Sequence, residues 1–107
     1  MLYKFKSKAA GDLIMLEPNG RRVLQIIGKD PGPQGIIEPV QMPGAIAALE
    51  AAIAREEADQ HAAADEAKAR GEEPPRVEGI SLRQRAVPFI DMLRRCENAG
   101  KEIVWGV

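Results

Sequence analysis

The chain has 107 residues, of which 45% are hydrophobic and only 4% aromatic, and its formal net charge is −1. A domain of this length can bury one core without a metal ion or a disulfide, and the single cysteine excludes an internal disulfide. A charge this close to zero argues against a general affinity for nucleic acid or anionic membranes, and no apolar run approaches the roughly 18 residues of a membrane span. With no basic-then-apolar leader either, we expect one cytoplasmic domain over residues 1–107.

The first two elements are predicted to be strands. Residues 2–7 alternate, with Tyr3 and Phe5 on one face and lysines on the other, which is typical of a strand with one side in water. Lysines also suit the edge of a sheet. After a turn at residues 8–12, the apolar run within 12–16 is expected to pair back as a second strand, with helix as the competing interpretation.

A short, largely buried helix is predicted next, over residues 18–27. Pro18 suits a first helical turn, Gly28 suits a helix end, and the apolar residues between them cover a wide arc. Two prolines and two glycines make residues 29–35 a loop. The pair Ile36-Ile37 then either contacts the sheet or covers the core.

Pro43 is placed to begin a second helix. Its core part, predicted over residues 43–56, carries a stripe of three large apolar side chains, Ile46, Leu49 and Ile53. Helix propensity continues to about Arg70, but residues 55–73 hold seven acidic against three basic residues and little apolar surface. We therefore expect residues 56–79 to form a charged extension, partly helical and partly flexible, with a hinge at Gly71, Pro74 and Pro75.

The last helix is the best-defined element, predicted over residues 81–99. Ser81 and Gln84 have the spacing of a capping box, and Gly100 can adopt the positive φ that ends a helix. Between them runs one apolar stripe, made of Leu82, Ala86, Phe89, Ile90 and Leu93. Pro88 removes one intrahelical hydrogen bond, which predicts either a kink or a new helix starting at Pro88.

A third strand is predicted over residues 102–107. Its β-branched and aromatic residues alternate, so that Ile103, Trp105 and Val107 share one face. The only tryptophan is thus expected to anchor this end of the chain in the core.

No combination of residues predicts a catalytic, cofactor or metal site. His61 is interpreted as a surface residue, because a metal ion needs three or four convergent ligands and its neighbours Glu57 and Asp65 suit surface pairs. Cys96 is interpreted as a small, half-buried apolar residue without a partner that would activate it. Four carboxylates at the ends of core elements are expected to be caps and turn formers, with acid–base chemistry as the alternative, namely Asp12, Glu17, Glu38 and Glu102.

Five cations form the candidate binding surface. Three lysines line the outer side of the first strand, and two arginines lie at nearly the same angle on the last helix; the set is Lys4, Lys6, Lys8, Arg83 and Arg94. If the two surfaces join, they could bind an acidic partner or an RNA backbone. The alternative is an ordinary solvated face.

Four segments, residues 5–9, 42–50, 85–93 and 100–105, together resemble the short bacterial proteins grouped as the domain-of-unknown-function family numbered eighteen-forty. The resemblance covers nearly the whole chain except residues 55–76. It implies a small free-standing cytoplasmic protein of bacteria, and it supplies no catalytic or binding residues.

The predicted fold is therefore α+β: a small, mainly antiparallel sheet of about three strands, covered on one face by about three helices. The leading functional hypothesis is a non-enzymatic interaction or regulatory module, homodimeric through a sheet edge or through the apolar surface of residues 43–70. The first alternative is a protein that binds small anionic metabolites, or a weak enzyme, with a pocket between the sheet and the last helix that uses Arg83 or Arg94. The second alternative is RNA binding through the cations.

Overall fold

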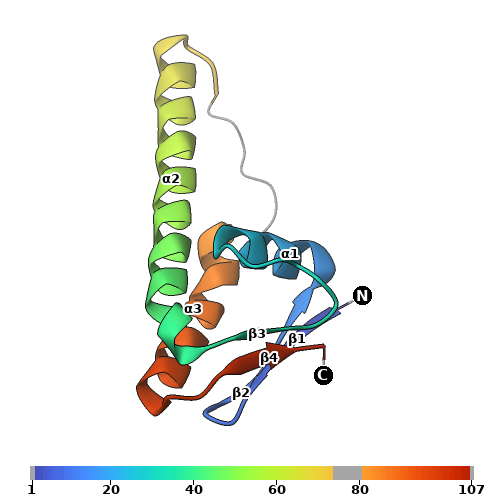
Figure 1. The fold of residues 1–107 in the computed structure, drawn as a ribbon. Coiled ribbons are helices and arrows are strands. Elements are labelled where there is room, and N and C mark those ends of the chain that lie inside the picture. Colours follow the sequence, from blue (N-terminus) through green and yellow to red (C-terminus); the bar gives the residue numbers. More distant parts are fainter. Residues whose placement is uncertain (1, 74–80, 107) are drawn as a thin grey trace.

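The computed structural model describes residues 2–73 and 81–106 and has an α+β fold of one four-stranded sheet and three α-helices (Figure 1). In chain order the elements are β1 (Leu2–Ser7), β2 (Ala10–Leu16), α1 (Glu17–Ile26), β3 (Gly35–Ile37), the 3-10 helix η1 (Pro39–Gln41), α2 (Met42–Ala69), α3 (Leu82–Ala99) and β4 (Ile103–Trp105). The predicted hinge prolines at 74 and 75 and the predicted strand residue Val107 lie outside the described residues.

The sheet is antiparallel throughout, in the order β2-β1-β4-β3. β1 and β2 form a hairpin, and β4 pairs with the other side of β1, where Phe5 faces Trp105. The fourth strand, β3, contains the Ile36-Ile37 pair and adds to β4 as the far edge. β1 is therefore an inner strand, and the prediction that its lysines protect a sheet edge is wrong, because β4 returns from far along the chain to cover that edge.

The three helices begin and end close to where the sequence predicts. In α3, the Ser81 side chain accepts from the Gln84 backbone N–H and the Gln84 side chain accepts from the Ser81 N–H, both at 3.2 Å, so the capping box is confirmed. Gly100 follows with a φ of 66°. Pro88 lies inside a helix that continues from Leu82 to Ala99, so the alternative of a separate helix from Pro88 is wrong.

α2 is 28 residues long and extends far beyond the rest of the described molecule (Figure 1). It ends at Ala69, next to the predicted limit. Its large buried side chains all lie in its first half, and they are Met42, Ile46, Leu49 and Ile53. Packing of large side chains therefore holds the first half, whereas the second depends more on helix propensity and on surface ion pairs such as Glu66–Arg70.

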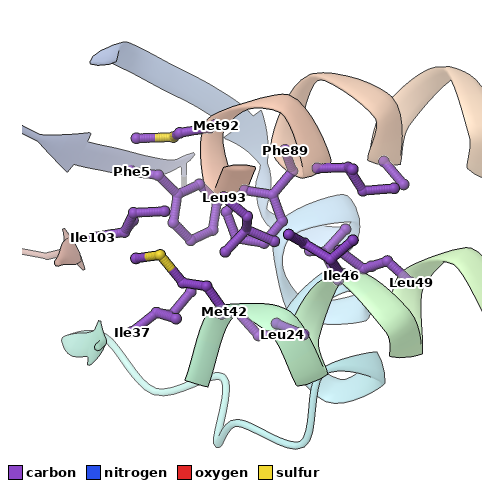
Figure 2. Close-up of a cluster of buried hydrophobic side chains, with 14 of the residues drawn as sticks. Phe5, Leu24, Ile37, Met42, Ile46, Leu49, Phe89, Met92, Leu93 and Ile103 are labelled. Atoms are coloured by element: carbon purple, nitrogen blue, oxygen red, sulfur yellow. The ribbon is translucent and has the colours of Figure 1, made fainter. Parts of the chain in front are cut away.

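The core lies between the sheet and the helices (Figure 2). The Phe5 ring of β1 is 4.7 Å from the Phe89 ring of α3 and 6.0 Å from Trp105, measured between ring centroids. Met42 from α2 and Leu93 from α3 close around this aromatic group (Figure 2). Cys96 is fully buried rather than half-buried, because α3 turns it toward the same core.

Trp105 also fixes the loop that precedes β3. Its indole N–H donates to the carbonyl of Gly32 at 3.0 Å, and the ring is only 2% exposed. Gly35 lies directly against this ring, since a Cβ built there would come within 2.1 Å of the indole. The Tyr3 hydroxyl holds the same loop by donating to the carbonyl of Pro31 at 2.7 Å.

Candidate functional site

The helices bury one face of the sheet. No described residue covers the other face. Side chains alternate between the two faces of a strand. Tyr3 and Phe5 point to the helices, so Leu2, Lys4 and Lys6 point away from them, and their cross-strand partners share that face. We call this surface the open face; it comprises Leu2, Lys4, Lys6, Ile14, Leu16, Ile36 and Val104.

The open face carries most of the exposed apolar side chains in the described part of the chain. Six large hydrophobic residues are exposed among the described residues. Four of them belong to the open face: Leu2 (61%), Ile14 (56%), Leu16 (62%) and Ile36 (43%). The remaining two are Val40 on η1 and Val87 on α3. Leu2 and Leu16 are direct cross-strand partners, and Ile14 is the partner of Lys4, so three of the four are contiguous.

Charged residues gather at the hairpin end of this face. The Lys4 ammonium lies 3.5 Å from the Asp12 carboxylate, and both side chains are about half exposed. Lys6, Lys8, Asp12 and Glu102 line one shallow hollow beside Val104. Of the four carboxylates considered in the sequence, Asp12 and Glu102 thus share a hollow with lysines.

The other two carboxylates have structural roles of their own. Glu17 pairs with Arg21 in the first turn of α1, at 3.9 Å. Glu38 and Gln41 form a reciprocal capping box at the start of η1. No acid–base pair is assembled by these two.

The predicted arginines lie between α2 and α3, away from the lysines. Arg83 donates two hydrogen bonds to Glu57, at 2.7 and 2.9 Å, and Arg94 donates one to Glu50 at 2.7 Å. The hydrogen bonds and charge of Arg83 hold the pKa of Glu57 below its ordinary value, although desolvation opposes them. The same hydrogen bonds, with the carboxylate's charge, raise the pKa of Arg83. The five predicted cations therefore occupy two places, with the lysines on the hairpin and the arginines joining the two long helices.

A cavity of about 300 Å³ lies between α2 and α3, next to both arginines. This cavity is not the anion pocket expected from the sequence, which would lie between the sheet and α3. Both guanidinium groups already hydrogen-bond to glutamates, and Glu50 and Asp91 also line the cavity. An anion entering here would have to displace a carboxylate and approach another.

The single histidine and the single cysteine lie in different environments. The His61 Nε2 lies 3.3 Å from Asp65 on the exposed surface of α2, whereas Cys96 is buried in the core. Among residues 2–73 and 81–106, no three histidine, cysteine, aspartate or glutamate side chains are grouped to hold a metal ion. In the same residues, no helix is both long and apolar enough to cross a membrane.

Sequence reasoning missed the open face as a candidate site. The signal was present, because Leu2, Ile14 and Leu16 occupy positions where the strand pattern requires outward side chains. What was lacking was the cross-strand register, which alone brings these residues together.

Comparison with known proteins found no match among curated proteins and none among solved structures. A family model described as "Domain of unknown function (DUF1840)" matches residues 1–105. The match spans every described strand and helix, including the charged outer half of α2. It also agrees with the resemblance noted in the sequence. The chain therefore belongs to the family described as Domain of unknown function (DUF1840).

Proposed function

We propose that this protein is a non-enzymatic interaction or regulatory module of the bacterial cytoplasm, and that it docks a protein partner on the open face. One observation carries the proposal: four of the six exposed large hydrophobic side chains in the described residues gather on this one face. Contiguous apolar patches on a protein surface commonly mark interaction sites. A partner that covered them would gain about 25 cal/mol for each Å² of apolar surface removed from water.

The pattern of the face supports a protein partner. The solvent-facing side of a sheet normally carries polar residues, yet Leu2, Ile14 and Leu16 lie together on this face, next to Lys4. Lys4 and its partner Asp12 stay half exposed beside the apolar group. An apolar centre with mixed charges at its rim is the usual anatomy of a protein–protein interface, so we expect a partner with an apolar centre of its own.

The test is capture from the native host with two matched variants. Ile14→Lys places a charge in the apolar group of the open face, and Val40→Lys places one at an 81% exposed site on η1. The affinity tag belongs in the turn after α2, within residues 71–73, so that β1 and β4 stay free. Each bait is divided into nuclease-treated and untreated halves.

We expect wild type and Val40→Lys to retain the same stoichiometric protein after nuclease treatment, and Ile14→Lys to lose it. Equal capture by all three baits would contradict docking on the open face. Recovery of nucleic acid alone, removed by nuclease, would point instead to the three lysines of the hairpin.

A further inference from the structure

We propose that this protein binds a small zwitterion with an apolar side chain, of the class of the free hydrophobic α-amino acids, in a cavity at the N-terminal end of β1. The cavity has a volume of about 230 Å³ and lies between the first residues of β1, the first turns of α1, the loop before β3 and the end of β4. We call it the β1 cavity. Ligand cavities commonly measure about 300–1,000 Å³, so this one suits a small molecule. The inference goes beyond the proposed function, because such a ligand needs no protein partner on the open face.

The wall of the β1 cavity is apolar, although Tyr3 and Trp105 form part of it. The Tyr3 hydroxyl donates to the carbonyl of Pro31 at 2.7 Å, and the Trp105 indole N–H donates to the carbonyl of Gly32 at 3.0 Å. Both polar groups are therefore satisfied within the protein, and these two rings offer carbon atoms to a ligand. The Pro33 ring adds to the same wall. This surface suits the apolar side chain of a ligand.

Glycine positions fix the shape of the β1 cavity. A Cβ at Gly20 would overlap the Tyr3 ring, so the backbone of α1 lies directly on that ring. A Cβ at Gly106 would overlap the carbonyl of Pro33, so the chain leaving β4 lies directly against the loop. The walls are thus held by backbone contacts and by the two hydrogen bonds to the loop. A site that is already formed spares a ligand the cost of ordering it.

Two opposite charges stand at the mouth of the β1 cavity. Glu17 and Arg21 both line it, one helical turn apart on α1, with side chains 39% and 49% exposed. The Arg21 Nη1 lies 3.9 Å from the Glu17 Oε1, which is longer than a hydrogen bond, and exposed ion pairs of this kind contribute little. An α-amino acid carries its ammonium and its carboxylate on one carbon. Its carboxylate would bind Arg21 and its ammonium Glu17, with charge-assisted hydrogen bonds that the protein pair lacks.

This pairing of charges distinguishes the β1 cavity from the cavity between α2 and α3. There, Arg83 and Arg94 already donate hydrogen bonds of 2.7–2.9 Å to glutamates, which a ligand would have to break. In the β1 cavity a ligand with a single charge would approach one like charge and one opposite charge. A zwitterion instead finds an opposite partner for each of its groups, so both signs are needed for tight binding.

Three probes with the same ring test the charge requirement on the purified full chain: L-phenylalanine, 3-phenylpropionate and 2-phenylethylammonium. L-leucine is titrated as a second zwitterion. Calorimetry measures binding, and the emission of Trp105, the only tryptophan, reports occupation of the cavity whose wall it forms. We expect both amino acids to bind saturably and to change this emission. L-phenylalanine should bind at least about tenfold more tightly than either probe with one charge.

Two variants should then exchange the preference among the probes. Arg21→Gln leaves only the carboxylate of Glu17, so L-phenylalanine should lose about tenfold in affinity and 2-phenylethylammonium should become the tighter ligand. Glu17→Gln should favour 3-phenylpropionate by the same reasoning. Arg70→Gln, at the exposed far end of α2, is the matched control and should leave every Kd unchanged.

Several results would overturn the site. One is the absence of saturable binding by both amino acids up to their solubility. Others are equal affinity for all three ring probes, or binding that leaves the emission of Trp105 unchanged. An order of preference that stays the same in Arg21→Gln and Glu17→Gln would also refute it, because a purely structural role of these residues could weaken binding but could not reverse which charge is preferred.

Discussion

Removal of the Trp105 side chain should cost roughly 3–5 kcal/mol of unfolding free energy. A tryptophan buries about 150–250 Å², and at about 25 cal/mol per Å² this amounts to about 4–6 kcal/mol as an upper estimate, because denatured chains already bury some surface. The Trp105 ring is 2% exposed and packs edge-on against Phe5. Its loss also leaves the carbonyl of Gly32 without its indole donor. We therefore expect Trp105→Ala to lower the free energy of unfolding by roughly 3–5 kcal/mol.

The assay is urea denaturation followed by circular dichroism, because Trp105→Ala removes the only tryptophan and with it the tryptophan fluorescence. Linear extrapolation gives the free energy and the m-value for wild type, Trp105→Ala and the control His61→Ala. His61 is exposed on α2, and its removal should change stability by no more than about 0.5 kcal/mol. Equal and small effects at both positions would refute the argument that β4 is part of the core.

Three further outcomes are expected. Gly35→Ala should destabilise by about 1–3 kcal/mol in the same urea assay, because its Cβ would overlap the indole. Gly44→Ala in α2 should cost nothing, because its Cβ would meet no atom beyond its chain neighbours and the local helix backbone; equal effects would contradict this. Ser81→Ala should cost about 1 kcal/mol through loss of the α3 cap, and an unchanged midpoint would refute the cap. Because the folded pKa of Glu57 is lowered, its stabilisation is complete above the unfolded value of about 4.3 and is lost as pH falls through the lower folded value. The melting-temperature difference between wild type and Glu57→Gln should therefore shrink in acid, and in an Arg83→Gln background it should be absent at every pH.

Local signals account for most of what the sequence predicted correctly. The capping box at Ser81, the stop at Gly100 and the alternation around Phe5 each need only a few neighbouring residues to be recognised. These signals also located α1, and they favoured a second strand after β1 without excluding a helix there. The fold class followed, because alternating strands and amphipathic helices leave few ways to cover an apolar face.

Features that depend on distant partners were not predictable in the same way. Arg83 and Arg94 meet glutamates that lie 26 and 44 positions earlier in the chain, which no helical angle reveals. Two isoleucines between prolines are too short a pattern to identify β3 as a strand. The inner position of β1 depends on β4, and the open face depends on the register between strands.

The pairing of β1 with β4 has a consequence for biosynthesis. Phe5 and Trp105 are partners although they lie 100 positions apart, while β1 and β2 can form their hairpin at once. At about 5–20 residues per second, a ribosome needs about 5–20 s to add the residues between them. During that time the inner edge of β1 lacks its partner strand β4, and the Phe5 side chain lacks its contact with the Trp105 indole. The nascent hairpin is therefore a natural substrate for chaperones that shield unpaired strands, and the rate of elongation, rather than hairpin formation, limits how soon the sheet can close.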